Sequence, residues 1–260
     1  MKHNSNAKNS IILEFKDVEF SYLNQKVINS LSWTIRRGEF QAFIGRSGCG
    51  KSTFLDLASG LTIPQTGVIE YHGQKIVGPI SDIGFVFQQP TLLDWMSVSE
   101  NILLPIKIKR LISKIDFLKL TELLNVLGIE KHINSFPWQL SGGQQSRVSI
   151  ARALINSPQI LMMDEPFASL DAITRDELQE LLINICRTHN IAVIFVTHDV
   201  QEAVFLSDRV CLMASGCFVE YFEIDLPQIR LPEIRFASNF NEQTARIKMA
   251  LLRKDKPSHE

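Results

Sequence analysis

Residues 45–52 carry the first pattern with a clear chemical use, Gly-Arg-Ser-Gly-Cys-Gly-Lys-Ser. This run fits the phosphate-loop spacing Gly-x4-Gly-Lys-Ser/Thr. Glycines here let backbone N–H groups converge on phosphate oxygens, and a helix that begins directly afterwards points its N-terminus at the same anion. Lys51 supplies a positive charge for β- and γ-phosphates, and the Ser52 hydroxyl is placed to ligate Mg²⁺. The pattern therefore predicts a binding site for the phosphates of a nucleotide.

A second candidate is an apolar run that ends in two adjacent acids. Residues 160–163 are Ile-Leu-Met-Met, and Asp164 and Glu165 follow them. Acids at the end of a buried strand need partners, because an unpaired charge there costs free energy. Asp164 suits a Mg²⁺ contact through water, and Glu165 suits polarisation of an attacking water. Alone, the pair is equally compatible with two solvated side chains; together with the phosphate loop it indicates hydrolysis.

The third candidate is the run Leu-Ser-Gly-Gly-Gln at residues 140–144. Ser141 can N-cap a helix from about Gly142 to Ile155, which leaves free N–H groups to face an anion. The run would then be a second anion site, although the phosphate loop already supplies the anion site that one bound nucleotide needs.

These motifs lie where strands and helices are predicted to begin or end. We expect strands over residues 11–20, 27–35, 39–44, 68–76, 83–87, 160–163 and 191–196, and helices over 51–59, 173–188 and 239–252. From Ser97 to Ile155 the spacing is helical, and one face of a helix ended by Gly128 is expected to carry Leu118, Leu123, Leu124 and Leu127. The alternation of strand and helix predicts a parallel sheet covered by helices, with a helical insertion near residues 90–155.

A phosphate loop, the Leu-Ser-Gly-Gly-Gln run and a strand that ends in Asp-Glu, in this order along the chain, strongly resemble the ATP-binding-cassette (ABC) ATPase family over about residues 12–220. The resemblance implies an α/β fold: a P-loop NTPase cassette with a RecA-like parallel core sheet, an antiparallel β subdomain and an inserted helical subdomain at about 90–155. Residues 1–11 are then a flexible N-terminus, and residues 221–260 a short C-terminal tail with a helix.

The resemblance also implies roles for residues, with ATP and Mg²⁺ as cofactors. The catalytic residues are Glu165, the switch histidine His198 and the Q-loop glutamine Gln88. The ATP-binding residues are Tyr22, Gly45, Arg46, Ser47, Gly48, Cys49, Gly50, Lys51, Ser52 and Thr53. The Mg²⁺ ligands are Ser52, Gln88 and Asp164. The residues that contact ATP held by a partner chain are Ser141, Gly142, Gly143, Gln144 and the D-loop aspartate Asp171. Tyr22 either stacks on adenine or is a core tyrosine at a strand end.

The family's mechanism implies a homodimer that closes head to tail around two ATP molecules and drives a membrane permease. Residues 87–95 are apolar for a loop, so Leu92, Leu93 and Trp95 either belong to the core or line a groove that docks the permease. This segment, with Asp225-Leu226-Pro227, resembles ATPases of the nitrate, sulfonate and taurine importers. The resemblance implies that the chain is a peripheral protein at the cytoplasmic face of the plasma membrane and that a solute-binding protein is an indirect partner. A soluble non-transport cassette, such as a cofactor-assembly ATPase, shares the ATP motifs and is the alternative.

Composition excludes several other classes. Twenty-seven basic and 28 acidic side chains give a net charge of −1, which argues against binding nucleic acid by bulk electrostatics. The longest stretch without charged residues has 15 residues, fewer than the roughly 20 that span a bilayer, and residues 1–10 lack the apolar run of a secretory signal. The four cysteines form no CxxC pair, and the loop N–H groups are expected to lower the pKa of the Cys49 thiol. Four histidines without metal-ligand spacing are expected at the surface: His3, His72, His132 and His189.

Overall fold

The computed structural model describes residues 10–23 and 25–253, which divide into two compact units. The first unit holds the described residues up to Ser81 and those from Cys186 onward. The second unit is Asp82–Ile185. His3 and most of the predicted flexible N-terminus lie outside the described residues.

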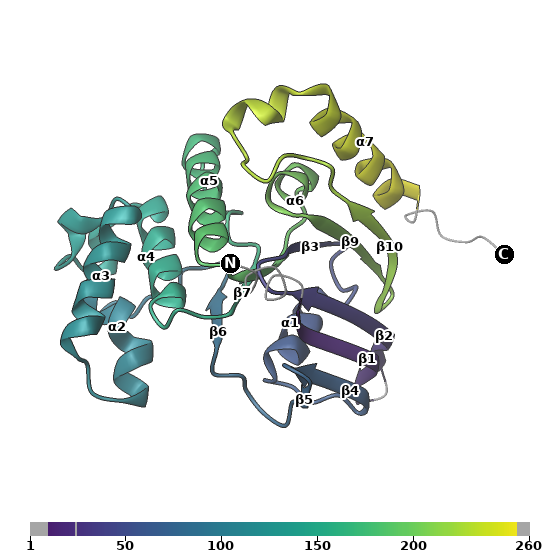
Figure 1. Ribbon diagram of the computed structural model, residues 1–260, viewed down its shortest axis with the longest axis horizontal. Helices are drawn as coiled ribbons and strands as arrows, with labels where there is room; N and C mark the ends of the chain where they lie inside the picture. The colour runs from purple at the N-terminus through teal and green to yellow at the C-terminus, as the bar shows by residue number, and fades with distance from the viewer. Residues whose placement is uncertain (1–9, 24, 254–260) are drawn as a thin grey trace, which may run out of the picture. The chain divides into compact units, whose positions relative to one another are not determined.

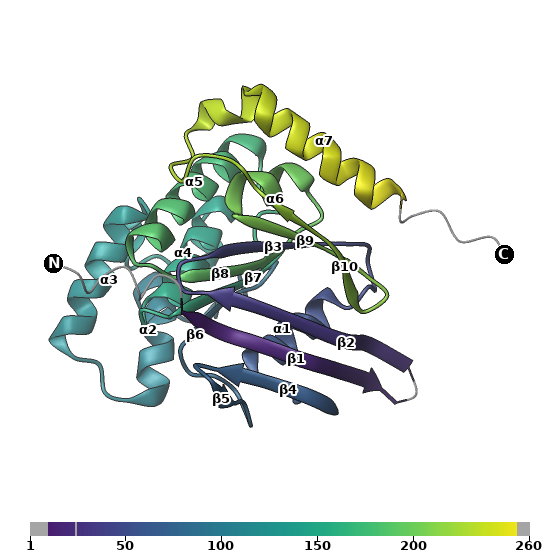
Figure 2. The same cartoon turned by 45° about the vertical axis from the view of Figure 1, so that its right-hand side comes forward.

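An antiparallel sheet forms one layer of the first unit, with strand order β2-β1-β4-β5. Its strands are β1 (Ile11–Tyr22), β2 (Gln25–Arg36), β4 (Thr66–Tyr71) and β5 (Gln74–Lys75). In β1, Leu13, Phe15 and Val18 are buried while the residues between Phe15 and Val18 are exposed. Figure 2 shows these strands side by side with α1 (Lys51–Ser59) behind them. Phe54 of α1 packs against Phe15, so the apolar face of the sheet is covered by the helix that follows the phosphate loop.

The other strands of the first unit centre on β3 (Phe40–Ile44), in which all five residues are buried. It pairs in parallel with β8 (Ala192–Val196) on one side and with β9 (Arg209–Ala214) on the other, and β10 (Cys217–Glu223) pairs antiparallel with β9. A continuous apolar run is typical of a parallel strand that is covered on both faces.

Three helices complete the first unit: α6 (Val200–Leu206), the short 3₁₀ helix η4 (Pro232–Phe236) and α7 (Ser238–Arg253). Both α6 and α7 lie along the same side of β9 and β10 in Figure 1. The helix α7 covers the predicted range 239–252.

The second unit combines a parallel strand pair with a cluster of helices. β6 (Ile83–Val86) pairs in parallel with β7 (Ile160–Asp164). The helices α2 (Val98–Lys109), α3 (Lys114–Val126) and α4 (Gly142–Leu154) lie side by side in Figure 1. The 3₁₀ helices η2 (Glu130–His132) and η3 (Pro137–Gln139) lie in the connection between α3 and α4. The helix α5 (Ala172–Thr188) begins in this unit and ends in the first.

Two local predictions were wrong. Residues 68–76 form a hairpin of β4 and β5, because His72 and Gly73 both adopt positive φ (50° and 72°) and turn the chain. Leu118 is exposed, and the buried positions of α3 are Asp116, Leu120 and Leu124. The buried face of the helix therefore keeps the i, i+4 spacing but lies to one side of the predicted face. The fold class was predicted correctly: a parallel sheet, an antiparallel sheet and a helical cluster are all present.

Candidate functional site

The loop of residues 45–50 connects the end of β3 to the start of α1. Gly45 has no room for a side chain, because a Cβ there would lie 2.3 Å from the backbone oxygen of Met213. Gly50 adopts a φ of 108° and precedes α1 without a side-chain cap. The first turn of α1 thus presents its N–H groups uncapped by any side chain, as an anion site at a helix N-terminus requires.

The Lys51 ammonium is held at the mouth of this loop. Its Nζ donates to the backbone oxygens of Gly45 at 2.7 Å and Arg46 at 2.9 Å. Arg46, Ser47, Gly48 and Ser52 are exposed around it, and Thr53 is buried. The ammonium is therefore held by two backbone carbonyl groups of the loop.

The expectation for Cys49 was wrong in direction. Burial raises the pKa of its thiol, and the neighbouring Lys51 ammonium only partly opposes this. The side chain lies under the loop, where the Cys49 backbone oxygen accepts from Gly216 N–H at 3.1 Å. Cys49 is thus a packing residue of the loop, with a thiol that resists ionisation.

The turn between β9 and β10 braces the phosphate loop, a contact that no local pattern in the sequence predicts. Gly216 donates to Cys49 and accepts from Asn29 N–H at 3.0 Å, so it connects the loop to β2. A Cβ at Gly216 would lie 2.2 Å from the Val27 backbone oxygen. The positive φ of Gly216 (77°) and the close approach of three chain segments both favour glycine at this position.

His198 follows β8 at the same edge where the phosphate loop follows β3. The two strands are parallel neighbours, and Thr197 N–H donates to the Phe43 oxygen at 3.2 Å. The residues on either side of His198 are fixed: the Thr197 hydroxyl donates to buried Glu202 at 2.6 Å, and Asp199 caps α6. The structure therefore presents an exposed imidazole beside the loop, on a backbone that both neighbours hold.

Tyr22, at the end of β1, is 49% exposed, so it is not a core tyrosine. Its ring meets the Phe20 ring edge-on, with centroids 4.8 Å apart. Part of the Tyr22 side chain is therefore accessible from solvent.

In the second unit, Gln88 and Glu165 are brought together although 77 positions separate them. β6 and β7 run in parallel with Val86 beside Met163, so the residues that follow them emerge at one edge. Gln88 Nε2 donates to Glu165 Oε2 at 3.5 Å. Asp164 is the last residue of β7, and Glu165 adopts a φ of 46° that is uncommon for a residue other than glycine.

The Leu-Ser-Gly-Gly-Gln run begins α4 as predicted. Ser141 Oγ accepts from Gln144 N–H at 3.3 Å, and Ser141 N–H donates to Gln144 Oε1 at 2.9 Å, a reciprocal capping box. Gly143 approaches Thr174, whose Cγ2 would lie 2.6 Å from an added Cβ. His132 is half-buried, with Nε2 3.0 Å from Gln144 Nε2, so it is a neighbour of this run rather than a plain surface residue.

Asp171 precedes α5 and is exposed. Its Oδ1 accepts from Thr174 N–H at 3.0 Å, and this backbone hydrogen bond lowers the pKa of the carboxyl. Arg147, behind the run, donates to the Leu127 oxygen at 2.8 Å and to Glu177 at 3.1 Å. It therefore ties α4 to both α3 and α5.

Residues 87–95 are held in place by two polar side chains that sequence reasoning missed. Asn101, fully buried, accepts from Leu93 N–H at 2.8 Å and donates to the Leu93 oxygen at 3.1 Å. Arg152 donates to the oxygens of Pro90 and Thr91, both at 2.8 Å. Leu92 and Leu93 are half-buried, whereas Trp95 is 73% exposed and so is not core.

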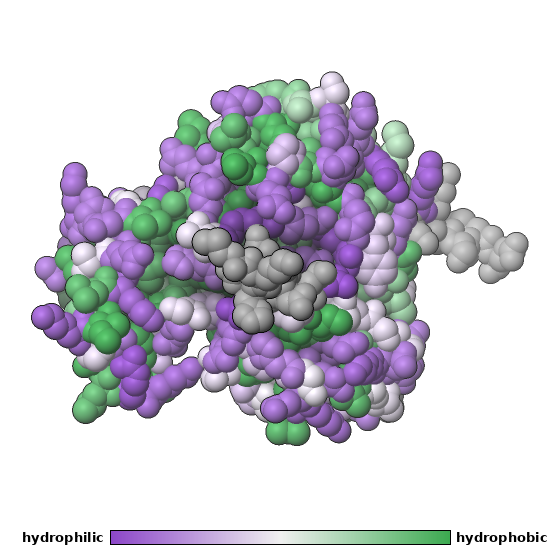
Figure 3. Space-filling view, viewed as in Figure 1, coloured by the Kyte–Doolittle hydropathy of each residue, from purple (hydrophilic) through white to green (hydrophobic). Residues whose placement is uncertain are grey.

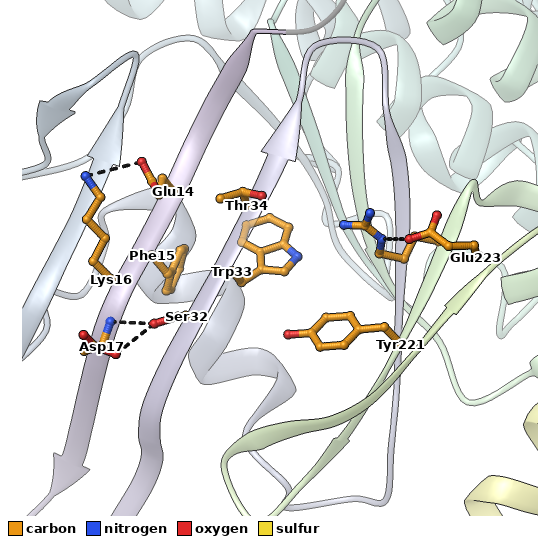
Figure 4. Close-up of a pocket in the computed structure, with 10 residues that line it drawn as sticks. Glu14, Phe15, Lys16, Asp17, Ser32, Trp33, Thr34, Tyr221 and Glu223 are labelled. Carbon is orange, nitrogen blue, oxygen red and sulfur yellow. Dashed lines mark hydrogen bonds and ion pairs between the residues drawn. The ribbon is translucent and has the colours of Figure 1, made fainter.

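A separate cavity of about 620 Å³ opens in the first unit beside β1, β2 and β10 (Figure 4). Four of its charged side chains form two ion pairs: Lys16 with Glu14 at 3.4 Å, and Arg209 with Glu223 at 2.6 Å. Burial raises the pKa of Tyr221 to about 12. None of the predicted site residues lines this cavity.

The predicted site residues thus fall into two sets. The first unit carries Tyr22, residues 45–53 and His198, and the second carries Gln88, residues 141–144, Asp164, Glu165 and Asp171. Among the described residues, no three His, Cys, Asp or Glu side chains are grouped to hold a metal. Within residues 10–23 and 25–253, no helix is long and apolar enough to cross a bilayer.

Comparisons with known proteins agree with these motifs. The ABC transporter family profile matches residues 28–168. The bicarbonate transport ATP-binding protein CmpC of Synechocystis sp. is 39% identical over 208 residues, 78% of this chain. The aliphatic sulfonates import ATP-binding protein SsuB of Bacillus cereus is 38% identical over 219 residues, 84% of this chain and 85% of its own length.

The chain spans only 31% of the length of CmpC. Among solved structures, the ATP-binding cassette MJ0796, a dimer in a post-hydrolysis state bound to ADP and Pi, has a TM-score of 0.73 and 30% identity. That match covers 83% of this chain and 100% of MJ0796. These relatives confirm the resemblance to cassettes of the sulfonate importer branch.

Proposed function

The chain belongs to the ABC transporter family and is an ATPase of that family, and we propose that it energises a membrane importer for nitrate, a sulfonate, taurine or a related small solute. The observation that carries this proposal is the hydrogen bond between Gln88 and Glu165. This bond joins the Glu165 carboxylate, which suits water activation, to Gln88 in the segment 87–95, whose backbone Asn101 and Arg152 hold. A change at the reacting phosphate is thereby coupled to a surface segment that carries an exposed tryptophan.

The roles follow from the local chemistry. The uncapped amides of α1 and the Lys51 ammonium bind the β- and γ-phosphates. Tyr22 stacks on adenine with its exposed face. Glu165 takes a proton from the attacking water, His198 donates to the γ-phosphate, and Gln88 orients the water and senses the phosphate.

Mg²⁺ fits the donor set of Ser52, Gln88 and Asp164, because a hydroxyl, an amide oxygen and a carboxylate are the hard oxygen ligands that this ion prefers. Proteins usually bind Mg²⁺ through one or a few side-chain oxygens together with nucleotide phosphates. When bound, Mg²⁺ neutralises charge that develops on the phosphate oxygens.

A homodimer supplies the second anion site. We expect Ser141, Gly142, Gly143 and Gln144 of one chain to meet the γ-phosphate held by the Lys51 of the other, with Asp171 at the same interface. The capping box supports this, because it fixes the N-terminus of α4 while Ser141 and Gly142 stay exposed. The dimeric MJ0796 cassette bound to ADP and Pi is an example of such an assembly.

The membrane permease is proposed to dock near Gln88 to Trp95, which would place the chain at the cytoplasmic face of the plasma membrane. Asn101 and Arg152 make this segment a firm platform, since both hold its backbone. A solute-binding protein takes part indirectly, by delivering solute to the permease. The names of CmpC and SsuB, which refer to bicarbonate transport and aliphatic sulfonates import, support a small anionic solute.

The hydrolytic part is tested by Glu165→Gln, with Glu122→Gln on α3 as the matched control. We expect phosphate release to fall by about 10²–10⁴ in Glu165→Gln, with an ATP-dependent dimer in size-exclusion chromatography. Lys51→Ala should weaken ATP binding itself, and Ser141→Arg should leave ATP binding intact but prevent the dimer. Retained turnover in Glu165→Gln, or a dimer of Ser141→Arg, would contradict the assigned roles.

The transport part is tested by purifying the tagged chain from its own cells in mild detergent. An integral membrane protein in one-to-one ratio is expected, and Trp95→Ala should reduce its recovery while ATP binding is unchanged. Recovery of soluble partners alone, with ATPase activity intact, would refute the transport assignment.

A further inference from the structure

The end of α2 and the start of α3 form a protruding surface that the proposed function does not use. Residues 107–119, here named the α2–α3 tip, carry five exposed large apolar side chains: Ile108, Leu111, Ile115, Phe117 and Leu118. Leu111 is 92% exposed and Ile108 77%. Over α2 and α3, Figure 3 shows hydrophobic side chains among hydrophilic ones. So many large apolar groups close together on a surface indicate a binding face.

The tip is a defined structure that holds these side chains outward. Asp116, buried, accepts two hydrogen bonds from the Arg110 guanidinium at 2.7 and 2.8 Å. It also accepts from the Ser113 N–H and hydroxyl at 2.8 and 2.7 Å, which closes the capping box of α3. These bonds hold the pKa of the Asp116 carboxyl well below its usual range. The turn between the helices is thus fixed by polar contacts made on its inner side.

The α2–α3 tip carries a net positive charge. Residues 107–119 contain five basic side chains and one acidic side chain, and the acid is the one paired with Arg110. Lys107, Lys109 and Lys114 are exposed and alternate with the apolar side chains. The whole chain has a net charge of −1, so this positive charge is local to the tip.

From this juxtaposition we propose that the α2–α3 tip binds an anionic lipid surface directly, with Leu111 and Ile115 inserted among the headgroups and with Lys107 and Lys114 paired with lipid phosphates. Large aliphatic and aromatic side chains interleaved with lysines are typical of segments that lie at a membrane interface. An acidic protein would match the charge alone. A lipid interface takes up both the lysine charges and the exposed apolar side chains.

The test uses the purified full-length chain and sedimentation with vesicles of phosphatidylcholine, with or without 30% phosphatidylserine. The wild-type chain is expected to bind the anionic vesicles and to be released as salt is raised to 1 M, where the screening length falls to about 3 Å. Lys107→Gln with Lys114→Gln should lower the partition coefficient by about 25-fold, since each lysine near such a surface contributes about fivefold. Leu111→Gln with Ile115→Gln should lower it by about tenfold or more.

The matched control is Lys75→Gln with Val77→Gln, which changes an exposed lysine and an exposed valine of the first unit. It should bind as the wild type does, and all variants should keep their circular dichroism and ATPase activity. Equal binding of the tip variants and the wild type would overturn the proposal. So would capture of the chain by poly-L-glutamate, but not by vesicles, an outcome that assigns the tip to an acidic protein. Vesicle sedimentation and capture by poly-L-glutamate need no nucleotide. Both results are therefore independent of the proposed transport function.

Discussion

Phe54 packs the helix that follows the phosphate loop against the strands of the first unit. It is fully buried in α1, three positions after Lys51. Its ring centroid lies 4.6–5.4 Å from those of four other aromatic rings, Phe15, Trp33, Phe43 and Phe218. These rings come from β1, β2, β3 and β10, so one side chain fastens the helix after the loop to both sheets of the first unit.

The loss of unfolding free energy expected for Phe54 variants follows from this environment. Phe→Ala in a core lowers the free energy of unfolding by about 3–5 kcal/mol, and aromatic pairs add about 0.5–1.5 kcal/mol beyond area burial. With four ring neighbours, Phe54→Ala is expected at the upper end, about 4–5 kcal/mol. Phe54→Leu retains most of the volume and should lose about 1.5–2.5 kcal/mol. A domain has about 5–15 kcal/mol in total, so Phe54→Ala leaves the first unit close to unfolding.

The assay is urea unfolding followed by tryptophan fluorescence in a Trp95→Phe, Trp138→Phe background. Trp33 is then the single tryptophan, because the chain has three, and it reports on the first unit alone. Phe236→Ala, at an 85% exposed position of the same unit, is the control and should change stability by less than about 0.5 kcal/mol. A loss below about 2 kcal/mol for Phe54→Ala would refute the packing argument, as would equal losses for the Ala and Leu variants.

Three other predictions concern the surroundings of Gly216, Gln41 and Cys186. Gly216→Ala should lower the melting temperature far more than Gly73→Ala. Both glycines have positive φ, but of the two only Gly216 would place a Cβ 2.2 Å from a backbone oxygen of β2. Equal shifts in melting temperature would mean that backbone conformation alone causes the loss. Gln41→Leu removes the acceptor 2.6 Å from Trp33 Nε1 and should lower the free energy of unfolding by about 1–3 kcal/mol, part of which Trp33→Phe restores in a double-mutant cycle; complete additivity would contradict this contact. Burial raises the pKa of the Cys186 thiol to about 12 from an ordinary 9.0. Between pH 9 and 12 the thiol therefore keeps its proton in the folded chain and loses it in the unfolded chain. The free energy of unfolding should fall over this range by about 1.4 kcal/mol per pH unit. Urea unfolding at pH 8 and 10.5 should show a steeper loss for the wild type than for Cys186→Ala, and parallel losses would count against the assignment.

The sequence alone determined the features that depend on contacts between near neighbours in the chain. The bounds of α1 and the loop before it were predictable, since glycine spacing and the helix that follows are local properties. The capping box from Ser141 to Gln144 joins residues three positions apart, so it too could be inferred before the fold was known.

Tertiary structure alone decided which distant groups meet. Gln88 and Glu165 touch because β6 and β7 pair in parallel, and Gly216 braces the phosphate loop because β9 lies beside β3. The pKa of Cys49 moved opposite to expectation for the same reason: local amides favour a thiolate, but burial under the folded loop outweighs them.

Exposure was likewise settled by packing. Leu118 and Leu120 are identical in type and differ by two positions, yet one is exposed and the other buried, because the rotation of α3 about its axis is fixed by Asp116 and the helices it packs against. Hydrophobic periodicity gives the spacing of a buried face but not its orientation when several leucines compete for it. That orientation is also what leaves the apolar side chains of the α2–α3 tip facing solvent.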